Sequence, residues 1–396
     1  MKRKSAFING LSSAASSLIA ILVGLAAGFV ILLISNPQNA LPGLSIILSG
    51  GFNEGMKSLG KVLYFATPII VTGLSVGFAF KTGLFNIGAT GQLMVGGFVA
   101  VLVGVRGGIF GPAQWLVALI CGMLAGALWG MVPGLFKALL NVNEVISSIM
   151  MNYIGMYGIN YLIKNLYFMN NGKKMMMVYN AAKSETFSVS ASAVIPSWGL
   201  DSIFFKLTKE GNKDVFSSLN GGIIIAIVLA IVIYILLNRT TFGYELKACG
   251  YNRSASRYAG INEKRSIILS MVIAGALAGT AGALMYLAPT EGLHIEVKEV
   301  LAAQGFTGIP VALLGLSNPL AIIFSGIFVA YITVGGANLT ILKYMEEIIS
   351  IIVGIIIYFS AFSLLIKQLL SRGAGKHKRR DEERELEGTK NAGKEA

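Results

Sequence analysis

The chain has few charged residues and very few of the side chains on which most enzymes depend. Charged residues make up 13% of its 396 residues, whereas a soluble domain has about 25%. Of its two cysteines, Cys121 lies in an apolar run and Cys249 in a basic stretch, so no disulfide framework is indicated. The two histidines lie in a connection and in the tail. The sequence therefore predicts no metal site, no cofactor and no His-dependent catalytic centre.

The chain also lacks a nucleotide-binding loop. No GxxxxGK[ST] sequence is present, so the protein does not hydrolyse ATP by that machinery. No catalytic triad or acid pair is recognisable either, and the sequence does not predict an enzyme. The net charge of +13 arises from cations at the ends of apolar runs and in the tail. Membrane topology explains that distribution better than nucleic-acid binding does.

Apolar residues dominate what is present. They make up 55% of the chain, and the mean hydropathy is +0.71. Several continuous apolar runs approach the ~20 residues that span a bilayer. We expect an all-α integral membrane protein of about ten transmembrane helices. The predicted spans cover residues 18–35, 62–80, 84–104, 113–135, 144–163, 220–237, 266–288, 299–316, 320–336 and 345–366.

The basic residues set the expected orientation. Lys2, Arg3 and Lys4 precede the first span, and cations in short connections mark the cytoplasmic side. An even number of spans places both termini in the cytoplasm. Residues 1–366 then form one polytopic transmembrane domain, and 367–396 form a charged, disordered cytoplasmic tail. Residues 164–219 contain no run long enough to span and are expected outside, as a small cap or a partner surface.

A basic segment at residues 238–265 connects the sixth and seventh spans. Its cations are Arg239, Lys247, Arg253, Arg257, Lys264 and Arg265, against the two acids Glu245 and Glu263. A connection that only reverses the chain needs ~2–6 residues. We expect a cytoplasmic segment of short helical pieces, broken at Gly243, Gly250 and Gly260. It is either a docking surface for a cytoplasmic partner or an ordinary solvated loop.

Two glycine-rich stretches with polar side chains are the candidates for a solute pathway. The first, TGLFNIGATGQ at 82–92, opens the third span, and the second, AAQGFTGIPVALLG at 302–315, is expected to break the eighth span. The second span is also expected to break, at Pro68 and Gly73. Interrupted spans at corresponding places in two halves point to a transport site. The candidate pathway residues of the two stretches are Phe85, Asn86, Gln92, Gln304, Phe306 and Thr307.

The two aromatic residues have two interpretations. The rings of Phe85 and Phe306 would stack on a flat solute, or they would simply pack within the membrane. The glycine-rich stretches likewise either line a cavity or let neighbouring helices approach closely.

The fifth span adds one more pathway candidate and an internal echo. In NVNEVISSIMMNYI, Glu144 is interpreted as a residue of the helix start. Asn152 lies on the same helical face two turns later and is a pathway candidate. The sequence EVISSI at 144–149 resembles EIISII at 347–352, which opens the tenth span. Spans two to five and seven to ten would then form an inverted-topology pseudo-repeat.

The motifs FNIGATGQ, NEVISSIMMNYI, TTFGYELKACGYNRSASRYAGI and GFTGIPVALLG together resemble those of bacterial ABC importer permeases. The resemblance is to the branched-chain amino acid/simple sugar permease superfamily, nearest the nucleoside (guanosine-type) uptake permeases, and covers about residues 60–366. The family motif commonly reads Asn-Ile-Gly-Ala-Glu-Gly-Gln, but Thr90 replaces the acid here, so no role of that acid carries over.

The resemblance implies ATP-driven import of nucleosides by alternating access, with simple sugars such as ribose or galactose as the alternative solutes. An ion-coupled secondary transporter is less favoured, because the spans nearly lack charged residues. The implied place is the bacterial cell (inner, cytoplasmic) membrane, with the chain passing through the lipid bilayer many times.

The resemblance also implies a set of partners. These are a cytoplasmic ABC ATPase, a second related permease and an extracellular substrate-binding lipoprotein. Within the basic segment, the residues implied to contact the ATPase are Tyr244, Gly250, Asn252, Arg253 and Tyr258.

Overall fold

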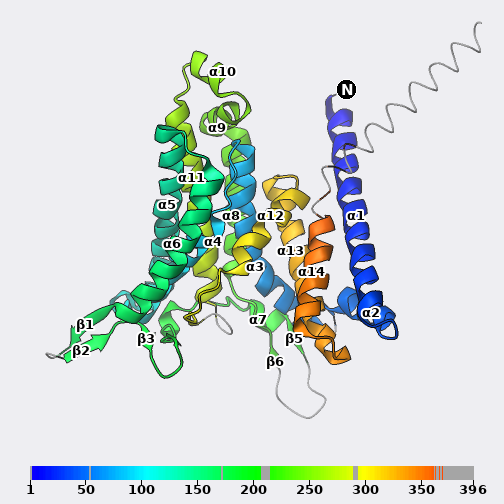
Figure 1. Cartoon of the computed structure of the whole chain (residues 1–396), viewed down its shortest axis with the longest axis horizontal. Helices are drawn as coiled ribbons and strands as arrows, with labels where there is room; N and C mark the ends of the chain where they lie inside the picture. The colour runs from blue at the N-terminus through cyan, green and yellow to red at the C-terminus, as the bar shows by residue number, and fades with distance from the viewer. Residues whose placement is uncertain are drawn as a thin grey trace, which may run out of the picture.

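The computed structural model describes residues 2–52, 55–170, 173–206, 215–288 and 293–360, together with 362, 365 and 368. The predicted tail at 367–396 lies outside the described residues apart from Gln368. The described chain is mostly helical (Figure 1). Its helices are α1 (Lys2–Ser35), α2 (Ala40–Ser49), α3 (Met56–Lys81), α4 (Ala89–Arg106), α5 (Gln114–Leu140), α6 (Glu144–Asn165), α7 (Leu200–Ile203), α8 (Gly222–Arg239), α9 (Thr241–Tyr251), α10 (Arg253–Tyr258), α11 (Glu263–Tyr286), α12 (Ala303–Leu314), α13 (Pro319–Ala337) and α14 (Glu346–Ser360).

Short strands and 3₁₀ turns complete the described structure. Three two-stranded antiparallel hairpins pair β1 (Tyr167–Asn170) with β2 (Lys173–Met176), β3 (Tyr179–Asn180) with β4 (Glu185–Thr186), and β5 (Phe205–Lys206) with β6 (Val215–Phe216). The 3₁₀ turns are η1 (Gly108–Ala113), η2 (Ala191–Ala193) and η3 (Asn338–Leu342). All three hairpins belong to the stretch at 164–219.

Seven of the described helical stretches are long and apolar enough to cross a membrane. They lie on α1, α3, α4, α5, α8, α11 and α13, while α2, α12 and α14 are shorter apolar helices. The expectation of a multi-pass helical membrane protein is therefore confirmed. Of the ten predicted spans, 299–316 and 345–366 fall on the short helices α12 and α14, and 144–163 falls on the 22-residue helix α6. The inverted pseudo-repeat stays a prediction.

The predicted helix breaks are wrong in three segments of the chain. Helix α3 runs unbroken through Pro68 and Gly73. Helix α12 runs through its two glycines and Pro310; the interruption of that span lies upstream, at the non-helical residues 293–302. In the basic segment, α9 continues through Gly243 and Gly250 and ends before Asn252. Glycine serves close packing at these places rather than a change of chain direction.

Helix α11 packs against α3, α4 and α5 and lies in the left half of the view in Figure 1. Its contact with α5 is a seam of small residues. A Cβ atom on Gly279 would lie 2.5 Å from the carbonyl oxygen of Gly122, and one on Gly130 would lie 2.6 Å from that of Met271. Such small-residue spacing lets membrane helices approach until their backbones touch. The high glycine content of the sequence is explained in part by this seam.

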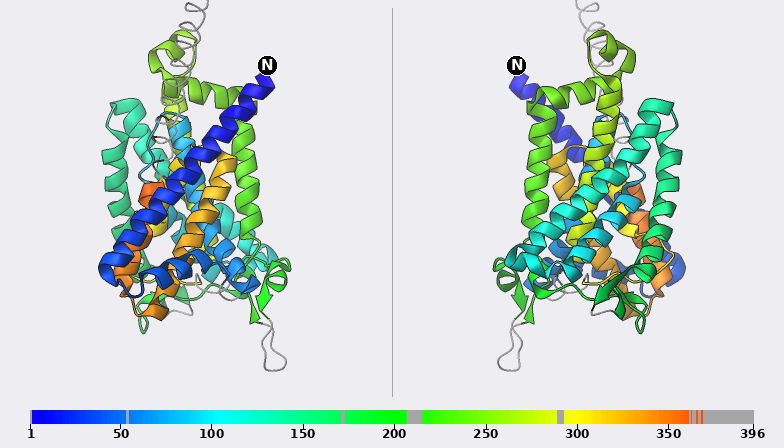
Figure 2. Two further views of the ribbon diagram at one scale, coloured as in Figure 1. Left: turned by 90° about the vertical axis from the view of Figure 1, so that its right-hand side faces the viewer. Right: turned by 90° about the vertical axis from the view of Figure 1, so that its left-hand side faces the viewer.

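A second, smaller apolar cluster joins α1 and α2 to α13 and α14. It contains Leu32, Ile47, Ile332, Ile352 and Ile356, all almost completely buried. Helix α1 runs obliquely along the outside of the bundle beside α14 (Figure 2). The first span thus packs against α14 rather than against α11.

The two polar connections lie at opposite ends of the bundle. Helices α9 and α10 and the beginning of α1 lie at one end, and the hairpins, α7 and α2 lie at the other (Figure 1). Helix α9 lies crosswise to the spans at its end (Figure 2). This arrangement agrees with the alternation of spans from which the basic segment and residues 164–219 were predicted to face opposite sides.

The stretch at 164–219 folds against the connection that leads into α12. The backbone N–H of Val189 donates to the carbonyl of Leu293 at 3.0 Å, and that of Ile195 donates to Leu287 at 2.9 Å. The side chain of Asn160, on α6, donates to the carbonyl of Lys298 at 2.8 Å. The described part of this stretch is therefore a packed cap at the hairpin end of the bundle.

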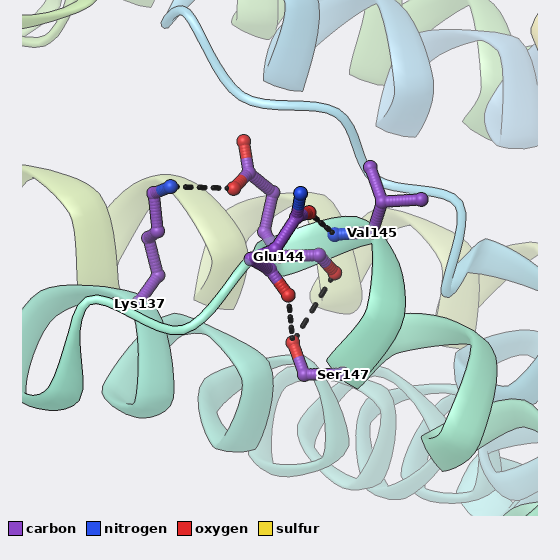
Figure 3. A network of polar contacts seen from close by, with 5 residues as sticks. Lys137, Glu144, Val145 and Ser147 are labelled. Atoms are coloured by element: carbon purple, nitrogen blue, oxygen red, sulfur yellow. Dashed lines mark hydrogen bonds and ion pairs between the residues drawn. The ribbon is translucent and has the colours of Figure 1, made fainter.

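Glu144 is a residue of the α5–α6 corner, as the sequence indicated. Its carboxylate lies 2.8 Å from the ammonium group of Lys137, near the end of α5 (Figure 3). Asn143 caps α6 by accepting from the N–H of Val145 at 2.9 Å. An acidic residue in the first turn also stabilises the positive end of the helix dipole.

Candidate solute pathway

The loop at 82–88 carries Asn86 into the interior, where it meets Gln92 in the first turn of α4. The Asn86 amide nitrogen donates to Gln92 Oε1 at 2.8 Å, and the Gln92 amide nitrogen donates to Asn86 Oδ1 at 3.0 Å. Asn86 also lies 3.1 Å from Ser75 Oγ on α3, and Ser75 donates to the carbonyl of Ala274 on α11 at 2.7 Å. Asn86 is 0% exposed and Gln92 is 1% exposed.

Asn152 on α6 completes this arrangement from a third direction. Its Oδ1 accepts from the backbone N–H of Gly91 at 2.8 Å, and its amide nitrogen donates to the carbonyl of Ile87 at 3.0 Å. Helix α4 begins after Gly88, which has no side chain to cap the helix. Asn152 therefore caps α4 from a neighbouring helix and satisfies one of its free N–H groups. We call Ser75, Asn86, Gln92 and Asn152 the amide cluster.

The amide cluster brings together three of the predicted pathway residues, but it does not offer them to a solute in this conformation. Asn86 and Gln92 make their hydrogen bonds within the amide cluster, Asn152 makes its hydrogen bonds to backbone groups, and each side chain is buried. Their role in the pathway stays a prediction.

Two hydroxyl groups beside the amide cluster are buried without a hydrogen-bond partner among the described residues. They are Thr90 Oγ1 and Ser148 Oγ. Thr90 packs against α12, because a Cβ atom on Gly305 would lie 2.8 Å from the Cβ of Thr90. A buried hydroxyl without a partner costs about 1–3 kcal/mol. The contact of α4 with α12 is thus tight at Thr90 but leaves one polar atom unsatisfied.

We expect Thr90→Val to raise the free energy of unfolding by about 1 kcal/mol, because valine has nearly the same shape and removes the unsatisfied hydroxyl. Chemical unfolding in detergent micelles measures this. Thr72→Val is the matched control: the Thr72 hydroxyl donates to the carbonyls of Pro68 and Ile69, both at 3.0 Å, so the control should gain nothing. Equal effects at the two positions would contradict the assignment.

A cavity of about 280 Å³ lies between α3 and α12. We call it the α3–α12 cavity. It is lined by Tyr64, Phe65, Thr67, Pro68, Ile69, Asn220, Leu284, Met285, Ala303, Gln304, Thr307 and Thr333. Two of the predicted pathway residues, Gln304 and Thr307, are among them. The described residues that line it include no acid and no base, so the cavity suits an uncharged solute.

The polar groups of the cavity are placed to recognise such a solute. Asn220 Oδ1 accepts from the N–H of Gly222 at 2.8 Å, which leaves its amide nitrogen as a donor. Thr307 donates to the carbonyl of Gln304 at 2.8 Å, which leaves a lone pair on its oxygen. The Gln304 side chain makes no hydrogen bond to another residue in the described part of the chain and can both donate and accept.

Helix α12 adds backbone donors to the cavity. It begins at Ala303, and Ala302 at its N-cap has no side-chain acceptor. The first N–H groups of a helix have no partner within the helix, and the helix dipole favours negative charge density there. An oxygen atom of a bound solute could accept a hydrogen bond from these N–H groups, and its partial negative charge would be favoured by the helix dipole.

The predicted aromatic residues do not line this cavity. Phe85 stacks on Phe80, with ring centroids 5.2 Å apart, as the packing interpretation expects. Phe306 lies on another face of α12, in an apolar groove of about 650 Å³ against Ile357 and Tyr358 of α14. The aromatic rings at the α3–α12 cavity belong to other residues.

Tyr64 and Phe65 are those aromatic residues, and sequence analysis missed them. Their rings meet edge to face at a centroid distance of 5.2 Å. They stand on α3 one turn before Pro68, which was the available signal. Asn220 and Thr333 were also missed, and nothing near them in the sequence marks them as polar groups of a cavity.

The basic segment carries exposed aromatic residues at the end of the bundle. Tyr244, Tyr251 and Tyr258 are 69%, 91% and 95% exposed. Asn252 has a structural role, because its side chain caps α10 by accepting from the N–H of Ala255 at 3.0 Å. Arg253 is half-buried and is the first residue of α10. Tyr251 was missed by the sequence analysis, and Tyr244, Gly250, Asn252, Arg253 and Tyr258 stay predicted ATPase contacts.

The one cysteine of the basic segment is a packing residue. Cys249 is 4% exposed, and its Sγ lies 3.9 Å from the carbonyl oxygen of Glu263 at the start of α11. Burial raises the pKa of the Cys249 thiol, so the thiol stays protonated and unreactive near neutral pH.

The permease family described as "Branched-chain amino acid transport system / permease component" matches residues 58–361. The chain belongs to this permease family. The protein is therefore a permease subunit of an ABC transporter and not an enzyme. The matched range runs from α3 to the end of α14, so it contains the α3–α12 cavity, the amide cluster and the basic segment.

Curated relatives of this permease extend over most of the chain. The guanosine ABC transporter permease protein NupP of Bacillus subtilis is 38% identical over 90% of this chain and 95% of its own. The nucleoside ABC transporter permease protein NupB of Lactococcus lactis is 33% identical over 90% and 92%. The glucose ABC transporter permease protein TsgB13 of Haloferax volcanii is 28% identical over 78% and 77%. No solved structure matches the chain.

Proposed function

We propose that the protein is the membrane permease of an ATP-driven nucleoside importer. The observation that carries this proposal is the similarity to guanosine and nucleoside permeases over nine-tenths of the chain. Permeases of this kind move a solute by exposing its site alternately to the two sides of the membrane. The two ends described above, with the cavity and the amide cluster between them, suit that mechanism.

The chemistry of the α3–α12 cavity supports a nucleoside. A nucleoside is uncharged and presents a flat base and a polar ribose. Tyr64 and Phe65 supply aromatic surface for the base, while Gln304, Asn220 and the N-terminus of α12 supply donors and acceptors. A nucleotide would bring a charged phosphate into a cavity whose described lining includes no lysine, arginine or histidine. Burying that charge without a partner would carry a large desolvation cost.

The basic segment supports a separate ATPase as partner. A permease of an ABC transporter is driven by ATP hydrolysis, and this sequence has no nucleotide-binding loop of its own. A separate subunit must therefore hydrolyse the ATP. The three exposed tyrosines and the surrounding cations form a surface of the kind that is used in protein contacts. We place this end, with both termini, in the cytoplasm, because basic connections face that side.

The opposite end is assigned to the outside of the cell. There the packed cap at 164–219 would meet a substrate-binding lipoprotein that delivers the solute. A second, related permease would complete the membrane part of the importer. These partners follow from the proposed function and are tested with it.

Simple sugars are the second candidate class of solute. The similarity to a glucose permease favours them, since that relative also covers about three-quarters of the chain. A sugar would use the same amides and hydroxyls but would need less of the aromatic surface at Tyr64 and Phe65.

Uptake measurements separate the two candidates. In cells that lack the gene, we expect uptake of labelled guanosine at low concentration to fall to the background that remains without the permease. Uptake of labelled ribose, galactose and glucose should stay unchanged, and the gene on a plasmid should restore guanosine uptake. Loss of sugar uptake with normal guanosine uptake would replace the nucleoside proposal by the sugar one.

A further inference from the structure

The end of α9 touches the loop that leads into the amide cluster, and the two backbones meet without side chains between them. A Cβ atom on Gly250 would lie 2.5 Å from the carbonyl carbon of Thr82 and 2.7 Å from the nitrogen of Gly83. A Cβ atom on Gly83 would lie 2.6 Å from the carbonyl oxygen of Gly250. Real Cβ atoms do not approach other atoms so closely, so the contact requires glycine on both sides.

The position of Gly250 links a surface to the interior. Gly250 belongs to α9 and is exposed on the side away from Gly83. One residue before it, Cys249 is buried against the start of α11, and one residue after it, Tyr251 is exposed. The last turn of α9 is therefore held between the loop at 82–88 and the start of α11, while its outer side is open to a partner.

The loop at 82–88 is tied to the pathway helices through the amide cluster. Gly83 precedes Asn86 by three residues, and Asn86 is hydrogen-bonded to Gln92 on α4 and to Ser75 on α3. The loop carbonyl of Ile87 accepts from Asn152 on α6. A displacement of Gly83 cannot occur alone, because these hydrogen bonds join the loop to three helices.

We propose that Gly83 and Gly250 are the positioning residues through which movement of the basic segment reaches the solute pathway. The inference rests on the proposed function, since it presupposes an ATPase that moves α9. A backbone-to-backbone contact has no side-chain rotamers to absorb a displacement, so a shift of α9 acts directly on the loop. Packed elements with discrete arrangements convert such small shifts into larger changes between two states.

The first test is Gly250→Ala in the assembled importer in proteoliposomes. Alanine favours a helix by about 1 kcal/mol over glycine, so α9 itself should be stabilised. The added Cβ, however, must push the Thr82–Gly83 backbone away. We expect a roughly fivefold drop in guanosine moved per ATP hydrolysed, equivalent to about 1 kcal/mol of lost coupling. The concentration of guanosine that gives half-maximal uptake should stay unchanged. Gly158→Ala is the control, because a Cβ on that helical glycine would have no neighbour within 4 Å among the residues that the structure describes.

The second test is Gly83→Ala against Gly55→Ala. Both glycines have a positive φ, +74° and +66°, so alanine is strained at both. A Cβ on Gly83 meets Gly250, whereas one on Gly55 meets no atom of the described residues within 4 Å. A shared effect of the two variants measures backbone strain, and the excess at Gly83 measures the contact. We expect the drop in guanosine moved per ATP only in Gly83→Ala.

Hydrogen exchange in the wild-type importer tests the inference without a substitution, so the result does not depend on whether a variant folds. The amides of residues 82–92 should change their exchange rate when ATP is added, together with those of α9. An unchanged rate at 82–92, or wild-type guanosine-to-ATP ratios in both Gly250→Ala and Gly83→Ala, would overturn the inference. A wild-type importer that hydrolyses ATP but does not move guanosine would instead overturn the proposed function.

Discussion

Replacing Gln304 by leucine is expected to lower guanosine uptake roughly thirtyfold, which corresponds to about 2 kcal/mol. Gln304 stands in the first turn of α12 and lines the α3–α12 cavity, and its amide makes no hydrogen bond within the described structure. Leucine has a similar size but cannot bond to the solute. When a buried polar group of the bound solute loses its hydrogen-bond partner, the free energy of binding weakens by about 1–3 kcal/mol.

The measurement is the initial rate of guanosine uptake at several concentrations in cells that contain equal amounts of the permease. The loss should appear at low concentration, as weaker binding. Ile309→Leu is the matched control, because it conserves volume on the same helix and Ile309 lies in the groove against α14 rather than in the cavity. Normal uptake by Gln304→Leu would remove the cavity from the pathway, whatever the result for the control.

Gln304→Asn refines the same experiment. Asparagine keeps the amide but shortens its reach by one methylene, so uptake should lie between those of the wild type and Gln304→Leu. An equal loss for asparagine and leucine would show that position as well as chemistry is needed. A wild-type rate for asparagine would place the solute contact within reach of the shorter side chain.

The two broken-span motifs illustrate what the sequence can and cannot predict. Glycine and proline in an apolar run predict an irregular membrane helix, and this pattern drew attention to Gln304 and Thr307. Both residues line the α3–α12 cavity, although α12 itself runs unbroken through its glycines and Pro310. The pattern did not show that Gly305 packs on Thr90 of α4 while Gln304 faces α3. Which side of a helix meets which neighbour depends on the packing of the whole bundle, and neighbouring residues do not encode it.

The cavity itself shows the same limit more clearly. Its lining comes from α3, α11, α12 and α13 and from Asn220 before α8. Tyr64 and Thr333 both line the cavity, although they lie 269 positions apart in the sequence (333 − 64). By contrast, Glu144 was understood from its neighbours alone, because a helix start depends on the residues within one turn of it.

The amide cluster gives the second large expected effect, on stability. We expect Asn86→Leu to lower the free energy of unfolding by about 3 kcal/mol, because it leaves the buried amide of Gln92 without its partner. Gln92→Leu should cost a similar amount for the reciprocal reason. Unfolding in detergent micelles, followed by circular dichroism, measures both. Asn165→Leu is the control, because the Asn165 side chain is exposed at the end of α6 and should change the free energy by less than about 0.5 kcal/mol.

The double variant Asn86→Leu/Gln92→Leu decides whether the two amides act as one unit. Removing both partners leaves neither of these amides unsatisfied, so its cost should be smaller than the sum of the two single costs by about 1–3 kcal/mol. Strictly additive costs would contradict the pairing. A positive coupling has a functional consequence, since a loop joined to α4 by more than 1 kcal/mol moves with that helix. Gly83 would then displace the start of α4, together with Thr90 against Gly305, and the closed contact between α4 and α12 would respond to the basic segment.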